Sequence, residues 1–177
     1  MQRAIRYFTV LCALVAGCAS VPKSQAARDQ LKSDATATQQ KMVEADPSLQ
    51  SVIDRSAGHI VFPEISQGGF VVGGAGGKGV IYEKNMPSGY AELSQASIGA
   101  QVGGQKYAEM VIVEDKATLD RIKAGKFDLG GEASAVVLRQ GAAAGTSFKN
   151  GVAVVINPLG GAMVSASITG QTIKTTM

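Results

Sequence analysis

The chain has 177 residues, and its 17 lysines and arginines against 14 aspartates and glutamates give a formal net charge of +3 at pH 7. It has a single histidine, which excludes a metal site built on several histidines. The basic residues are not gathered into the clustered surface that a nucleic-acid partner requires, so we expect no nucleic-acid partner.

The first 18 residues have the features of a secretory signal that ends in a lipid attachment site. Arg3 and Arg6 precede an apolar run over 7–15, which is much shorter than the roughly 20 apolar residues of a transmembrane helix. Residues 14–18 read Leu-Val-Ala-Gly-Cys and resemble the bacterial lipobox, in which small residues precede a cysteine that becomes acylated. We therefore predict a lipoprotein signal peptide over residues 1–17 and acyl chains such as palmitate on Cys18.

Two other interpretations of this terminus stay open: an ordinary cleaved signal, and a buried helix that carries a cysteine by chance. Under the lipoprotein interpretation, Cys18 is followed by Ala19 rather than by aspartate, which favours the outer membrane over retention in the inner membrane. We accordingly expect an outer-membrane lipoprotein of the bacterial envelope that faces the periplasm.

Processing changes the composition. Two of the 17 basic residues leave with the signal, and 15 minus 14 gives a mature net charge of +1. Cys12 also leaves and Cys18 is acylated, so no thiol remains for a disulfide, a metal site or a nucleophile. The roughly 130 residues of the globular part are enough for one domain with its own core.

Residues 18–47 are predicted to be a lipidated tether followed by a polar helix over Ser24–Ala45. The helix has a thin stripe of less polar positions: Leu31, Ala35, Thr38 and Met42. A second helix is predicted after Pro47, with Gly58 at its carboxyl end. Its apolar face has helical spacing: Leu49, Val52, Ile53 and Ala57.

From His59 onward the sequence favours strands separated by glycine clusters. The strand-like runs lie at 70–72, 80–82, 110–113, 136–138, 152–156 and, by alternation, 164–169. One helix interrupts them, with Asp115 as its cap, Leu119 and Ile122 facing inward and Gly125 at its end. The predicted class is α+β: a mainly antiparallel sheet or barrel-like domain with an N-terminal helical segment and one or two further helices.

The chain offers little that would support catalysis. Residues 74–79 match the dinucleotide pattern GxGxxG, but a strand rather than a helix follows, so we interpret them as a glycine-rich hairpin. His59 is interpreted as a satisfied histidine at a helix–strand junction, and Glu114-Asp115 as a helix start rather than an acid/base pair. We expect no enzyme activity, no cofactor and no metal.

The order of segments in the β-rich part resembles the SYLF lipid-binding domain family. The segments are Ala57–Pro63, Gly79–Tyr82, Ser97–Gly104, Phe127–Gly130 and Ala133-Ser134. The resemblance covers about Leu49 to the C-terminus and implies a compact α+β domain at 48–177 without known catalytic activity, associated with membrane lipid. In eukaryotic relatives the lipid is a phosphoinositide. Bacterial envelopes generally lack phosphoinositides, so we expect either another anionic phospholipid as the ligand or a different purpose for this surface.

Four lysines that border strand-like runs are candidate lipid contacts: Lys78, Lys84, Lys106 and Lys149. Lys78 is placed at a glycine-rich tip, where backbone N–H groups and an ammonium could together bind a phosphate. The alternative is that all four are solvated charges at strand ends. At the level of the whole protein, the first hypothesis is a lipid-binding module and the second is an adaptor that binds another envelope protein.

Overall fold

The computed structural model describes residues 22–70, 72–98, 103–129, 134–137, 141–161 and 170–177. The helices of this part are α2 (Gln25–Ala45), α3 (Ser48–Asp54) and α4 (Lys116–Lys123), with a short 3-10 helix η1 (Ala143–Gly145). The strands are β1 (Gly58–Phe70), β2 (Val72–Glu83), β3 (Met86–Ile98), β4 (Gly103–Val113), β5 (Lys126–Asp128), β6 (Ser134–Val137), β7 (Val152–Gly161) and β8 (Gln171–Thr176).

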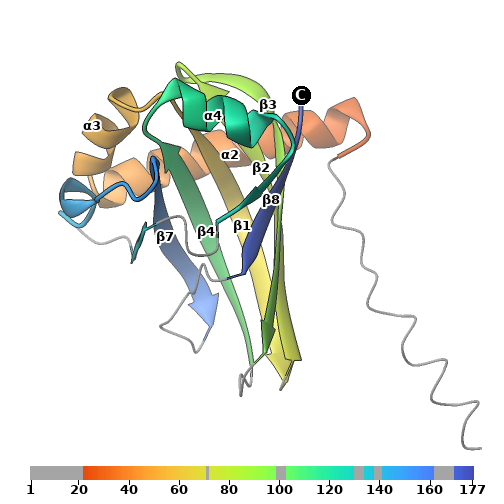
Figure 1. Cartoon of the computed structure of the whole chain (residues 1–177). Coiled ribbons are helices and arrows are strands. Elements are labelled where there is room, and N and C mark those ends of the chain that lie inside the picture. Colours follow the sequence, from red (N-terminus) through yellow and green to blue (C-terminus); the bar gives the residue numbers. More distant parts are fainter. Residues whose placement is uncertain (1–21, 71, 99–102, 130–133, 138–140, 162–169) are drawn as a thin grey trace, which may run out of the picture.

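The described strands form one sheet in the order β5-β8-β3-β2-β1-β4-β7-β6, which curls into a half-barrel (Figure 1). Every neighbouring pair is antiparallel except β6 and β7, which are parallel. The predicted α+β class, with a mainly antiparallel sheet or barrel-like domain, is confirmed.

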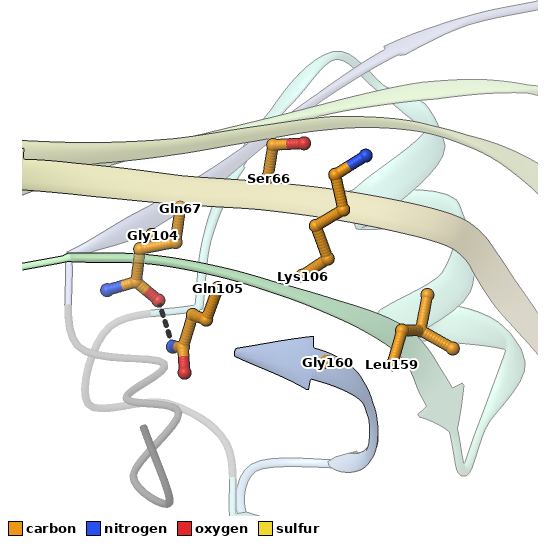
Figure 2. Close-up of a pocket in the computed structure, with 7 residues that line it drawn as sticks. All are labelled: Ser66, Gln67, Gly104, Gln105, Lys106, Leu159 and Gly160. Carbon is orange, nitrogen blue, oxygen red and sulfur yellow. Dashed lines mark hydrogen bonds between the residues drawn. The ribbon is translucent and has the colours of Figure 1, made fainter. Parts of the chain in front are cut away.

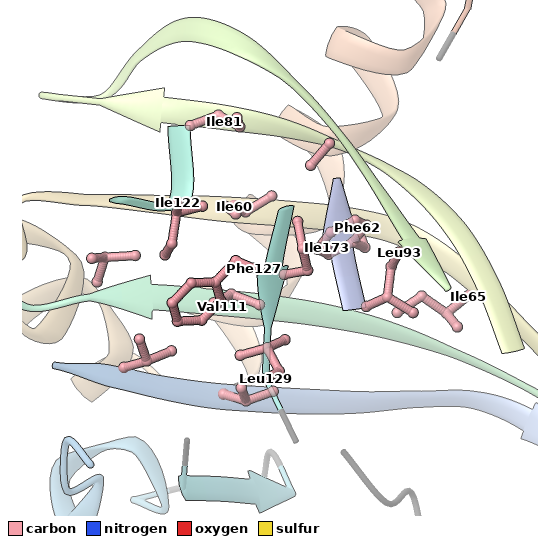
Figure 3. Packing of buried hydrophobic residues seen from close by; sticks show 14 of the residues in the cluster. Ile60, Phe62, Ile65, Ile81, Leu93, Val111, Ile122, Phe127, Leu129 and Ile173 are labelled. Atoms are coloured by element: carbon pink, nitrogen blue, oxygen red, sulfur yellow. The ribbon is translucent and has the colours of Figure 1, made fainter. Parts of the chain in front are cut away.

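Both faces of the sheet carry a cluster of buried side chains. Since successive side chains of a strand point to opposite faces, a single strand contributes to both clusters. On β4, Val111 and Val113 join the cluster on the concave face, while Met110 and Ile112 join the cluster on the convex face. Figure 3 shows the concave cluster, in which Phe62, Leu93 and other side chains from several strands meet.

Each face is closed by a different helix. The convex face is covered by α2, which crosses the sheet at the back of Figure 1, and by α3. The concave face is covered at one end by α4, whose Leu119 and Ile122 are fully buried. Full burial of such a side chain contributes about 1.5–3 kcal/mol.

The polar helix that we predicted over Ser24–Ala45 is confirmed, and it is packed on the sheet. Ser24 caps it by accepting a hydrogen bond from the Ala27 amide, and Ala35 and Met42 are fully buried. Two hydrogen bonds also tie it to the sheet: the Thr36 and Tyr82 hydroxyls lie 3.3 Å apart, and Gln39 bonds His59. The helix is therefore part of the packed fold.

The prediction that Gly58 ends the second helix is wrong. The helix ends at Asp54, and Gly58 begins β1, paired with Glu83 and Val113. A Cβ at Gly58 would lie 2.6 Å from the Tyr82 carbonyl oxygen. Close approach of two strands, rather than a helix cap, requires a glycine here.

Two further predictions change in detail. The run at 70–72 is not one strand, because Phe70 ends β1 and Val72 begins β2. The glycines of residues 74–79 lie within β2 and not at the turn of a hairpin.

The strands predicted at 80–82, 110–113 and 152–156 are confirmed, as is the helix capped by Asp115. The alternating run at 164–169 and Leu138 of the run at 136–138 lie outside the described residues.

Candidate functional site

The structure separates the four candidate lysines into two pairs. Lys78 in β2 and Lys106 in β4 lie on the convex face, on the half of the sheet that α2 leaves uncovered. Lys84 lies at the turn between β2 and β3 with a positive φ of 52°, and Lys149 precedes the turn into β7. Both of these turns are at the opposite end of the sheet from the β1–β2 connection. A single four-lysine site is therefore not formed.

Lys78 does not sit at a glycine-rich tip. It lies in the middle of β2, where it is the ladder partner of Glu64 on β1 and of Glu92 on β3. The backbone N–H and C=O groups of a strand with neighbours on both sides are hydrogen-bonded within the sheet. The free N–H groups that we expected to bind a phosphate are therefore not present at this position.

These residues belong to a row of alternating charges across the convex face. In the order of the strands the row reads Lys106, Glu64, Lys78, Glu92 and Lys174. Opposite charges facing each other across two strands contribute roughly 0.2–1 kcal/mol per pair. The Lys106 ammonium lies 2.8 Å from Glu64, and this hydrogen bond holds the pKa of the Glu64 carboxyl below its usual value.

Lys106 also lines a pocket of about 380 Å³ where β4 meets the end of β7 (Figure 2). Its other lining residues are Ser66, Gln67, Gly104, Gln105, Leu159 and Gly160. The Gln105 amide donates a 2.7 Å hydrogen bond to Gln67, and Leu159 is 51% exposed. The pocket thus combines a cation, amides and an apolar rim, a mixture found in sites for small polar ligands.

A basic and aromatic cluster at the start of α2 was missed by the sequence reasoning. The Arg28 guanidinium lies 5.4 Å from the centre of the Tyr90 ring and the Lys32 ammonium 5.9 Å from it. Both distances are within the range of a cation–π contact. Interaction with the Tyr90 hydroxyl, foremost a hydrogen bond, raises the pKa of Lys32 above its usual value.

Local contacts hold this cluster in place. The Arg28 side chain donates a 2.9 Å hydrogen bond to the Pro22 carbonyl, and Asp29 lies 3.7 Å from the Lys32 ammonium. Arg28 and Lys32 are four residues apart, so the sequence alone predicts that they lie on one face of the helix. It does not predict their shared contact with Tyr90, which is 58 positions after Lys32 and is brought to them by the tertiary structure.

His59 is buried and serves the packing of α2. Its ring stacks on Tyr82, with 5.0 Å between ring centres, and its Nε2 lies 2.9 Å from the Gln39 side-chain oxygen. Burial lowers the pKa of His59 to about 4. The interpretation of His59 as a satisfied histidine at a helix–strand junction is confirmed.

The described ranges contain no group of three or more His, Cys, Asp or Glu side chains that could hold a metal ion. No helix in them is long and apolar enough to cross a membrane.

Comparison with known proteins adds no family or relative: no protein-family model matches the chain, and no curated protein does.

Proposed function

We propose that this chain is a lipoprotein of the SYLF type, anchored through acylated Cys18, whose domain binds anionic phospholipid without catalysing a reaction. The observation that carries the proposal is the cluster of Arg28, Lys32 and Tyr90, because it lies where the chain from Cys18 enters the fold. This cluster replaces Lys78 as the main lipid contact.

The reach of the chain supports this assignment. Six residues, 19–24, separate Cys18 from the first residue of α2. At roughly 3.5 Å per extended residue they span at most about 20 Å. Since α2 is packed on the sheet, it cannot serve as a spacer, and the anchor would hold the start of α2 close to the headgroups.

The chemistry of the cluster suits a phosphate. A guanidinium presents several N–H donors in a fixed plane, and an ammonium adds a second positive charge. Tyrosine, with an apolar ring and a polar tip, is enriched at membrane interfaces. Each basic residue near an anionic leaflet contributes about 1 kcal/mol to binding.

An adaptor role is the second candidate, and the convex face favours it. The row from Lys106 to Lys174 alternates in sign, so it matches a partner protein with complementary charges better than a uniformly anionic surface. The pocket beside Lys106 lies at one end of the same row.

Liposome co-sedimentation of unlipidated residues 19–177, which retain every described element, tests the proposal. Vesicles of phosphatidylcholine alone are compared with vesicles that also contain phosphatidylglycerol, at low and moderate salt. We expect salt-sensitive binding to the anionic vesicles. The double variant Arg28→Gln/Lys32→Gln should weaken it by about ten- to thirtyfold, as expected for the loss of two basic contacts.

The matched control is the double variant Lys78→Gln/Lys106→Gln, which removes the same charge from the convex face. It should bind the anionic vesicles nearly as well as the wild type. If the control loses binding and the α2 variant keeps it, the lipid contact lies at Lys78 and Lys106, on the half of the convex face that α2 leaves uncovered. No binding of the wild-type domain to any vesicle would reject the lipid-binding proposal and favour the adaptor role.

A further inference from the structure

The concave face of the half-barrel contains a buried polar cluster that the proposed function does not use. It comprises Gln95 on β3, Tyr107 and Glu109 on β4, and Gln171 on β8. Glu109 and Gln171 are fully buried. Buried carboxyl groups are rare unless they are paired, so this one needs an explanation.

Gln171 connects strands that are not neighbours. Its Nε2, which carries two hydrogens, lies within hydrogen-bond distance of three acceptors: Glu109 at 3.2 Å and Tyr107 at 3.3 Å, both on β4, and Gln95 at 3.5 Å on the neighbouring β3. In the sheet, β3, β2 and β1 separate β8 from β4. The contacts with Glu109 and Tyr107 therefore run across the interior of the half-barrel and hold its two sides together.

Acceptors exceed donors in the contacts of this cluster. Within the described part of the chain, Glu109 Oε1 and Gln171 Oε1 have no hydrogen-bond partner, although both atoms are buried. Each unsatisfied buried polar atom carries a desolvation penalty. A proton on Glu109 Oε1 would let the acid donate to Gln171 Oε1 and would satisfy both oxygens at once.

We propose that Glu109 and Gln171 form a carboxylic acid–amide pair that latches β4 to β8 and releases when Glu109 ionises. The 3.2 Å bond from Gln171 Nε2 to Glu109 Oε2 is one of the two hydrogen bonds of this pair. The second is donated by the protonated Glu109 Oε1 to Gln171 Oε1. Ionisation removes the second hydrogen bond and leaves a negative charge in the interior of the half-barrel.

The surroundings of Glu109 agree with a neutral acid. Burial raises its pKa from 4.5 to about 7. Its ladder neighbours are the apolar Phe62 on β1 and Ile156 on β7, and β3 and β8 contribute neutral amides. Among the described groups that face it, Tyr107 alone is titratable; burial and the Glu109 charge raise the pKa of that phenol. No described cation offsets the Glu109 charge.

The first test is urea unfolding of residues 19–177 and of the variant Glu109→Gln between about pH 4.5 and pH 8. Because the folded-state pKa is raised, the stabilisation is complete below pH 4.5 and is lost as pH rises through about 7. The unfolding constant of the wild type, divided by that of the variant, should rise about a hundredfold over this range. Taking the ratio cancels the contribution of His59, which both proteins share.

The second test locates the opening. Hydrogen exchange, corrected for intrinsic rates, should show that rising pH lowers the protection of the β8 amides more than that of the β1 amides, which open only when the whole domain unfolds. Glu109→Gln, which keeps the amide contact but cannot ionise, should abolish the change in β8. Glu92→Gln is the matched control: it removes the same charge on the convex face and should behave like the wild type.

Two results would overturn the latch. One is a pH-dependent loss of β8 protection that persists in Glu109→Gln. The other is recovery of β8 protection at about pH 8 on addition of calcium chloride, which would assign the two unpartnered oxygens to a cation site instead.

Discussion

At the scale of single residues, His59 shows how burial sets the charge of a side chain. The ring is 1% exposed, stacked on Tyr82 and bonded to Gln39. A buried imidazolium would lose its hydration without gaining an anionic partner, so the neutral ring is favoured and its pKa falls to about 4. The sequence placed His59 at the junction of a helix and a strand, but both partners come from distant parts of the chain.

We expect His59 to stay neutral down to about pH 4, and an NMR titration of the imidazole protons checks this directly. The chain has one histidine, so the signal needs no assignment. Because the folded-state pKa is lowered, His59 stabilises the fold above pH 6.5 and loses this effect as pH falls towards 4. A titration midpoint near 6.5 would contradict the buried, uncharged ring.

At the scale of elements, α4 is the helix for which local sequence decides most. The Asp115 carboxylate accepts hydrogen bonds from the Thr118 amide at 2.8 Å and from its hydroxyl at 2.9 Å. The carboxyl end of α4 is followed by Gly125, whose φ of +143° favours glycine, so this residue ends the helix. Cap, apolar spacing and terminator lie within twelve residues of one another, which is why the prediction of this helix was correct.

Replacing Asp115 by alanine should lower the free energy of unfolding by about 1 kcal/mol, because the amides of the first turn lose their acceptor. Chemical denaturation measures the change. Asp120→Ala is a suitable control, since Asp120 is an exposed residue of the same helix that pairs with Lys116. The control should change the free energy of unfolding by about 0.5 kcal/mol or less; equal effects of both variants would argue against capping as the cause.

At the scale of the whole molecule, the fold depends on helix α2 closing the convex face. Its apolar stripe is thin, but Met42 is fully buried in the cluster that includes Val61, Met110 and Ile112 from the sheet. A domain boundary after residue 47 would leave this side of the sheet exposed. The packed unit therefore includes α2.

Met42→Ala should lower the free energy of unfolding by about 2–5 kcal/mol, the range for a truncation that leaves a cavity in a core. Met86, which is 65% exposed, supplies the matched control. Met86→Ala should change the free energy by about 0.5 kcal/mol or less. Urea unfolding of the two variants checks both values, and a small effect at Met42 would show that α2 is only loosely attached.

The candidate sites were less predictable than the elements. The sequence indicates which lysines border strands, but the neighbours of these lysines depend on how the strands pair. We predicted Lys78 at a tip, whereas it lies opposite Glu64 and Glu92. The prediction was wrong because glycines that suggest a turn can also allow two strands to approach closely. A Cβ at Gly79 would lie 2.7 Å from the Phe62 ring.

The sequence by itself determined the elements whose signals are local: the capped helices α2 and α4, the strands rich in Val and Ile, and the α+β class. Tertiary structure alone decided the order of the strands, the packing of α2 and the two polar clusters. Arg28 and Lys32 meet Tyr90, and Glu109 meets Gln171, across 58 or more positions. Such contacts depend on strand pairing and on burial in the whole molecule, which no short window of sequence contains.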